Sequence, residues 1–89
     1  MARKPSEIPV NLVKADGTTT VVTMTARQKA LFDLLFNSLD TYVTTEDILR
    51  ELNISIENLR VTKQQVQRIV NGYYAIVCKR GHSYSMCRV

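Results

Sequence analysis

Three polar side chains in the last third of the chain have the chemistry to read nucleic-acid bases. Gln64, Arg68 and Asn71 recur at intervals of four and three residues, which places them on one side of a helix. Arginine can bond guanine at O6 and N7, and glutamine or asparagine can bond adenine at N6 and N7, from a major groove wide enough to admit a helix. Gln67 lies at the margin of the same side. We therefore interpret Gln64, Gln67, Arg68 and Asn71 as candidate base-reading residues.

The distribution of charge along the chain indicates a polyanionic partner. Residues 1–57 carry eight acidic and six basic side chains, whereas the chain from Asn58 to Val89 carries six basic residues and no carboxylate. A field of one sign attracts a nucleic acid better than the same net charge scattered evenly. This carboxylate-free stretch supplies the residues that we expect to contact the DNA backbone: Arg60, Lys63, Lys79, Arg80 and His82.

A helix face of glutamine, arginine and lysine can also be ordinary solvent-exposed surface, so the interpretation depends on the elements around it. Residues 1–7 form a polar leader, and residues 8–89 are long enough for one small domain. Apolar and polar residues alternate over 8–14, residues 15–17 supply a turn with glycine, and residues 18–23 are rich in β-branched side chains. This pattern predicts an N-terminal β-hairpin.

Two helix starts follow the hairpin. Thr25 and Gln28 have the spacing of a capping box, in which the two side chains bond backbone N–H groups at the first turn of a helix. Thr44 and Asp47 repeat this signal in a weaker form and predict a second helix over residues 45–52, after a very short strand. Apolar residues three and four positions apart in these helices are the expected core: Leu31, Leu34, Leu35, Ile48, Leu49 and Leu52.

The third helix is the one that carries the candidate base-reading residues. Thr62 and Gln65 have capping-box spacing and predict its start, and Gly72 stands where it would end. The segment from Asn53 to Val61 is then a connection between the second and third helices. On this interpretation the outward face of the third helix carries no carboxylate, and its core side consists of Val66, Ile69 and Val70.

A second hairpin closes the chain. Residues 74–78 and 83–87 are β-branched, aromatic or alternating, and the turn at residues 79–82 is basic. The order hairpin, helix, short strand, helix, helix, hairpin is that of a winged helix-turn-helix. The predicted fold is therefore α+β, with three helices, an N-terminal β-hairpin and a C-terminal β-hairpin wing.

Three segments resemble a known family. Met24 to Leu35, Val43 to Leu49, and Lys79 to Tyr84 are similar to the first-helix opening, the second-helix start and the wing of the DNA-binding effector domains of OmpR/PhoB-type response regulators. The resemblance covers about residues 8–87. It implies a third helix in the major groove, wing contacts to the backbone or minor groove, and a loop between the second and third helices that can touch RNA polymerase. The resemblance does not extend to a receiver domain, so we expect no regulation by phosphorylation within this chain.

Other functional classes find little support. Cys78, Cys87 and the single histidine are too few for a zinc site, which needs four nitrogen or sulfur ligands. The sequence has no glycine-rich phosphate loop and no nucleophile paired with a base, so we expect neither an enzyme nor a metal or cofactor. No apolar run reaches the roughly 20 residues of a membrane span, and no signal peptide begins the chain, so we expect no membrane contact and a cytoplasmic location.

The sequence thus predicts a duplex-DNA-binding regulator of transcription, of a size that fits a free-standing phage or bacterial protein. One reading helix contacts only a few base pairs, so we expect a homodimer on DNA, tandem sites or a partner protein. The alternative is an interaction module that docks on RNA polymerase or another regulator through the first hairpin, the segment from Asn53 to Val61 or the acidic second helix. RNA is a third partner class, favoured if Tyr73, Tyr74 or Tyr84 is exposed.

Overall fold

The computed structural model describes residues 8–14, 16–79 and 82–89, so the predicted leader lies outside the described residues. β1 (Ile8–Val13) and β2 (Thr19–Met24) form the predicted hairpin, with Ile8 opposite Met24 and Val13 opposite Thr19. One face of this hairpin packs on the domain, because alternate side chains of a strand point to opposite faces. The turn is closed by Gly17 at φ +92, a backbone conformation that glycine adopts without strain.

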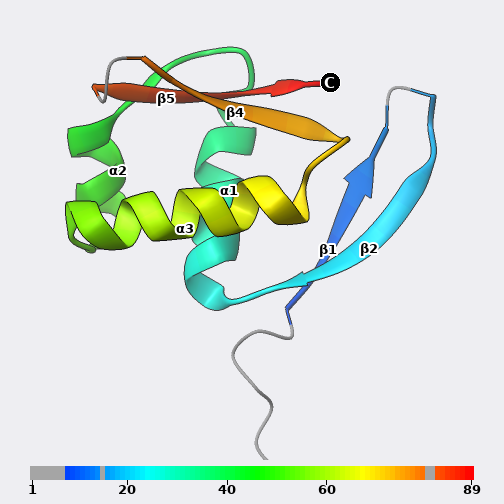
Figure 1. Ribbon diagram of the computed structural model, residues 1–89, viewed down its shortest axis with the longest axis horizontal. Helices are drawn as coiled ribbons and strands as arrows, with labels where there is room; N and C mark the ends of the chain where they lie inside the picture. Colours follow the sequence, from blue (N-terminus) through cyan, green and yellow to red (C-terminus); the bar gives the residue numbers. More distant parts are fainter. Residues whose placement is uncertain (1–7, 15, 80–81) are drawn as a thin grey trace, which may run out of the picture.

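The first helix follows its predicted capping signal. α1 (Ala26–Phe36) begins after Thr25, whose side chain accepts from the Gln28 N–H at 3.1 Å while the Gln28 amide oxygen accepts from the Thr25 N–H at 2.9 Å. Leu31, Phe32 and Leu35 are buried, and α1 contacts both other helices, β5 and both strands of the first hairpin. It is the central element of the domain (Figure 1).

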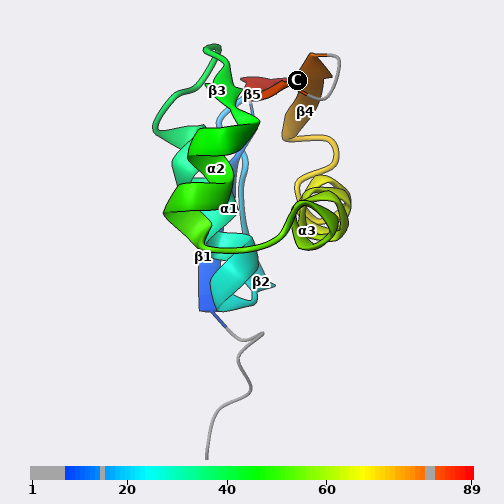
Figure 2. The same cartoon turned by 90° about the vertical axis from the view of Figure 1, so that its left-hand side faces the viewer.

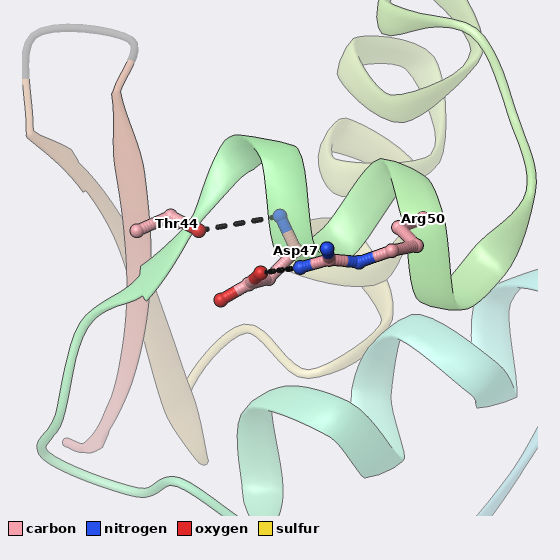
Figure 3. A network of polar contacts seen from close by, with 3 residues as sticks. All are labelled: Thr44, Asp47 and Arg50. Atoms are coloured by element: carbon pink, nitrogen blue, oxygen red, sulfur yellow. Dashed lines mark hydrogen bonds and ion pairs between the residues drawn. The ribbon is translucent and has the colours of Figure 1, made fainter.

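The predicted second helix is also confirmed. β3 (Val43–Thr44) leads directly into α2 (Thr45–Leu52), where the Thr44 hydroxyl accepts from the Asp47 N–H at 3.2 Å. Figure 3 shows this cap, together with the ion pair between the Asp47 carboxylate and Arg50 one turn later. The helix ends at Asn53, which adopts the left-handed conformation (φ 53) that asparagine tolerates better than most residues.

The predicted start of the third helix is wrong. α3 (Ile56–Ile69) begins six residues before Thr62, the first residue of the expected box, and is capped by the Ser55 hydroxyl, which accepts from the Asn58 N–H at 3.3 Å. Thr62 lies inside the helix, where it is buried and its hydroxyl donates to the Asn58 carbonyl at 2.7 Å. The connection between α2 and α3 is therefore residues 53–55 alone, and most of the proposed polymerase-contacting loop is helical.

The second hairpin joins the short strand in one sheet. β4 (Tyr74–Lys79) and β5 (Ser83–Arg88) pair antiparallel, and β3 pairs with the other edge of β5, which gives the strand order β3-β5-β4. This sheet lies across the top of the helices in Figure 1, while β1 and β2 form a separate hairpin at the right of the view. The protein is thus an α+β fold of three helices and two small antiparallel sheets. No helix in residues 8–14, 16–79 and 82–89 is long and apolar enough to cross a membrane.

Candidate nucleic-acid interface

The outward face of α3 is defined by four exposed residues. Leu59, Thr62 and Val66 are buried against the rest of the domain, so the opposite side of the helix faces solvent. Glu57, Val61, Gln64 and Arg68 are exposed there, at spacings of four, three and four residues. No hydrogen bond or ion pair with another described residue engages the side chains of Gln64 and Arg68. The side chains of these two predicted base-reading residues are therefore available to contact a ligand.

Two members of this face were missed by the sequence interpretation, which started the helix too late. Val61 is 53% exposed in the middle of the face, and an apolar side chain there can contact the methyl group of thymine. Glu57 lies in the first turn, where its carboxylate interacts favourably with the helix dipole. The expectation of a carboxylate-free face is thus wrong at one end, and the basic and amide side chains occupy the middle and C-terminal end of the helix.

Gln67 has a structural role instead of a free side chain. Its amide nitrogen donates to the Tyr74 carbonyl at 3.3 Å, and its amide oxygen accepts from the Ile76 N–H at 2.7 Å. Both hydrogen-bonding groups of this glutamine therefore bind the backbone of β4 and hold the second hairpin against α3. We leave Gln67 out of the proposed base-reading set.

Asn71 lies beyond the helix. α3 ends at Ile69 with Val70 as its C-cap, and Gly72 (φ +89) turns the chain towards β4. The Asn71 side chain is exposed in this turn. Asn71 follows Gln64 and Arg68 in sequence but lies in a turn. The periodicity of the helix therefore does not determine the direction of its side chain.

A shallow hollow of about 350 Å³ borders the outward face. It separates α3 from the N-terminal turn of α1, and a hydrogen bond of 2.8 Å from the Gln28 amide to the Gln65 amide oxygen links the two helices beside it. This bond fixes α3 relative to α1, although residues 28 and 65 are far apart in sequence. The hollow is lined by Thr25, Ala26, Arg27, Val61, Thr62 and Gln65.

The predicted backbone-contacting residues lie on α3 and on the second hairpin. Arg60 is exposed on α3 and Lys63 is half-buried there, while Lys79 and His82 are exposed at the turn between β4 and β5. The Lys79 ammonium lies 5.6 Å from the centre of the Tyr42 ring. The backbone of His82 is held at the start of α2, because the Thr45 N–H donates to the His82 carbonyl at 2.8 Å. Arg80, also predicted to contact the backbone, lies outside the described residues.

Arg60 brings positive charge to the place where α3 approaches the second hairpin. Tyr84 of β5 is buried, and this burial raises the pKa of its phenol above the usual value. The neighbouring Cys78 raises that pKa further, whereas the positive charge of Arg60 lowers it. Arg60 therefore lies within electrostatic range of Tyr84 on β5.

Acidic side chains gather on another part of the molecule. Glu46 and Glu51 are exposed on α2, and Arg50, the cation of that helix, is paired with Asp47 (Figure 3). α2 and α3 lie on opposite sides of the domain in Figure 2, with α3 on the same side as β4. A polyanion is thus favoured on the side of α3 and the second hairpin and disfavoured on α2.

No protein-family model matches this sequence, and comparisons with curated proteins and with solved structures return no significant match. The resemblance to the OmpR/PhoB-type effector domains therefore stays a prediction from three short segments of the sequence.

Tyr73, Tyr74 and Tyr84 do not offer a platform for unpaired bases. Tyr74 and Tyr84 are 3% and 5% exposed, and Tyr73 is half-buried with its hydroxyl donating to Thr20 Oγ1 at 2.7 Å. The condition that favoured RNA is not met, because stacking on a base needs an exposed ring. Among residues 8–14, 16–79 and 82–89, no group of three histidine, cysteine, aspartate or glutamate side chains could hold a metal ion.

Proposed function

We propose that this protein is a winged-helix regulator that binds duplex DNA with α3 in the major groove and the β4–β5 hairpin on the backbone or minor groove. The observation that carries the proposal is the outward face of α3, on which Gln64 and Arg68 are exposed and form no side-chain hydrogen bond or ion pair with another described residue. Such side chains can form the bidentate contacts that distinguish adenine and guanine.

The arrangement of the elements supports the proposal. The elements follow the order α1, β3, α2, α3, β4, β5, and the short strand pairs beside a terminal hairpin, as a winged helix requires. In this arrangement Arg60 and Lys63 of α3 and Lys79 of the hairpin contact phosphates, and Gln64 and Arg68 contact bases. Asn71 reads a base from the turn after the helix. The acidic α2 faces away from the duplex.

Glu57 orients α3 within this complex. Its carboxylate lies at the N-terminal end of the outward face, where a nearby phosphate would be repelled. The duplex therefore lies closest to the middle and C-terminal half of the helix, around Val61, Gln64 and Arg68. The arginine at the far end then reaches furthest into the groove.

Binding to random duplex DNA tests the electrostatic part of the proposal. Four phosphate contacts, from Arg60, Lys63 and Lys79 together with the predicted contact of Arg80, predict that the logarithm of the binding constant falls with the logarithm of the salt concentration with a slope of about −4. Fluorescence anisotropy with a labelled duplex measures this slope. Lys79→Ala should make it shallower by about one, since it removes one phosphate contact. A slope near zero between low and physiological salt would rule out DNA binding through these cations.

Removal of the Glu57 charge should strengthen binding. Glu57→Gln is expected to raise the affinity for random duplex DNA about two- to fivefold at low salt, and the gain should shrink as salt rises. Glu51→Gln is the matched control, because it changes the net charge equally but lies on α2. Equal gains from both variants would show that only the net charge matters and that α3 does not face the duplex.

A further inference from the structure

The two edges of the first hairpin differ in their ability to pair with another strand. The Lys14 N–H donates to the Thr18 carbonyl at 2.8 Å, and hydrogen-bonded pairs of an antiparallel ladder recur at every second residue. With Leu12 opposite Thr20 and Val10 opposite Val22, the backbone groups of Thr20 and Val22 point towards β1. The backbone N–H and C=O groups of Thr19, Val21 and Thr23 therefore point to the outer edge of β2. The backbone groups of residues 9, 11 and 13 point to the outer edge of β1.

Proline blocks the edge of β1. Pro9 has no N–H group, and its position in the register places the missing donor at the outer edge. Natural sheets use proline in this way to prevent pairing with other chains. β2 has neither a proline nor a charged residue between Thr19 and Met24. Among the strands that the structure describes, β2 pairs only with β1, so its other edge is open.

This open edge lies at the border of the molecule. β2 runs along the outer right side of Figure 1, away from the three-stranded sheet. Thr19 and Thr23 are exposed, and Val21 is 61% exposed in the centre of the strand. The edge thus combines unpaired backbone donors and acceptors with β-branched side chains, a combination that favours strand pairing.

We propose that β2 is a dimer interface, on which β2 of a second copy of this chain pairs antiparallel with Val21 on the twofold axis. In this register Val21 faces its own symmetry mate and Thr19 faces Thr23 of the second copy, so every outward N–H of these residues meets a carbonyl. A shift by one residue would place outward groups opposite inward ones. The second copy is therefore the occupant whose pattern of donors and acceptors fits this edge by symmetry.

Charge also favours the second copy as the partner. The strand itself is uncharged, so two copies meet without repulsion along their length. Antiparallel pairing brings the turn of one copy, with the exposed carboxylate of Asp16, towards the end of β2 in the other, which leads to the exposed Arg27. Hydrogen bonds from Thr18 lower the pKa of Asp16, which keeps it ionised. The ammonium of Lys14 is turned away over the Tyr73 ring, 5.3 Å from its centre.

The dimer has a closed form. Pairing produces a four-stranded sheet in the order β1-β2-β2-β1, and the strand at each end carries Pro9 on its outer edge. Growth beyond two copies is therefore blocked, because a closed twofold interface uses the same open edge of both copies. The interface requires no DNA, so its test is independent of the test of the proposed function.

Sedimentation equilibrium without DNA tests the interface. The average mass should rise with protein concentration from 10.1 kDa towards a plateau at twice that value. Val21→Pro removes an N–H at the open edge, breaks no bond within the hairpin and should keep the protein monomeric. Asn11→Pro is the matched control, because it removes an outward N–H from the β1 edge and should dimerise like the unaltered chain.

A second variant keeps the test decisive if Val21→Pro impairs folding. Val21→Lys keeps the backbone donor at an exposed position but places two ammonium groups across the axis, and it should raise the dissociation constant of the dimer at least about tenfold. Amide exchange should also show that protection of the Val21 N–H rises with protein concentration while that of Asn11 does not. A monomer at all concentrations, equal loss of dimer in Val21→Pro and Asn11→Pro, or masses that grow beyond two copies would each overturn the proposal.

Discussion

Replacement of Leu35 with alanine should lower the free energy of unfolding by about 2–5 kcal/mol, because the side chain is completely buried and its loss leaves a cavity. Leu35 lies on α1, the helix that contacts both other helices and both sheets. A small domain has only about 5–15 kcal/mol of stability in total. Thermal or urea unfolding followed by circular dichroism should therefore show a large loss.

Leu34→Ala is the matched control for this prediction. Leu34 is the neighbouring residue on the same helix, with the same change in side-chain size, but it is only half-buried. Its loss should cost clearly less than that of Leu35. Equal effects of the two substitutions, or a shift of the Leu35→Ala melting temperature by only a degree or two, would contradict the placement of α1 at the centre of the core.

Gln67→Ala should destabilise the domain by about 2–4 kcal/mol, an effect that its position on a polar part of α3 does not suggest. The substitution removes the partners of the Tyr74 carbonyl and the Ile76 N–H, and an unsatisfied buried backbone group costs about 1–3 kcal/mol. Tyr74 and Ile76 are both buried, so water does not readily replace the lost amide. Chemical denaturation of the variant measures the effect.

Gln64→Ala separates this structural role from a role in binding. Gln64 has the same side chain on the same helix but is exposed, so its loss should change the free energy of unfolding by less than about 0.5 kcal/mol. Its loss should instead weaken DNA binding. If Gln67→Ala proved as stable as Gln64→Ala, the bonds from Gln67 to β4 would not contribute to the fold.

Local signals in the sequence are sufficient to predict most of the helices and strands. Both β-hairpins, α1 and α2 follow from alternation and from caps whose partners are only three residues away, such as Thr25 with Gln28 and Thr44 with Asp47. These interactions are formed within a single turn, so the residues that determine them are neighbours in the sequence. The buried positions Leu31 and Leu35 follow from the same periodicity.

The start of α3 was mispredicted because two segments had similar capping patterns. Thr62 and Gln65 have the spacing of a capping box, but Ser55 caps the helix, and Thr62 is turned inwards between Leu59 and Val66. The continuous spacing of Leu59, Thr62 and Val66 is a signal that could have revealed the longer helix. A threonine inside a helix can satisfy its hydroxyl on the carbonyl four residues earlier, so its polarity does not exclude it from the core.

The candidate site was predicted only in part, because tertiary contacts decide which polar side chains are free. Gln64, Gln67 and Arg68 look equivalent in the sequence. The Gln67 side chain, however, forms hydrogen bonds to the backbone of β4, whereas those of Gln64 and Arg68 form none with another described residue. The contact between Gln67 and β4 depends on how the second hairpin returns to α3, which no local pattern specifies. Glu57 and Val61 were not predicted to lie on the outward face, because the predicted helix began after them.

Selection of bound sequences from a random duplex pool, carried out with the unaltered protein and with two arginine variants of α3, tests the proposed interface most directly. Arg68→Ala should cost about 1–3 kcal/mol on the preferred site and remove the preference at one base pair, most simply a guanine. Arg60→Ala removes the same charge from the same helix but should leave the selected sequence unchanged, weaken specific and random DNA alike, and make the salt slope shallower by about one. If Arg68→Ala instead selected the same sequence as the unaltered protein and lost affinity equally for specific and random DNA, α3 would contact only the backbone and the proposed reading of bases by its outward face would be wrong.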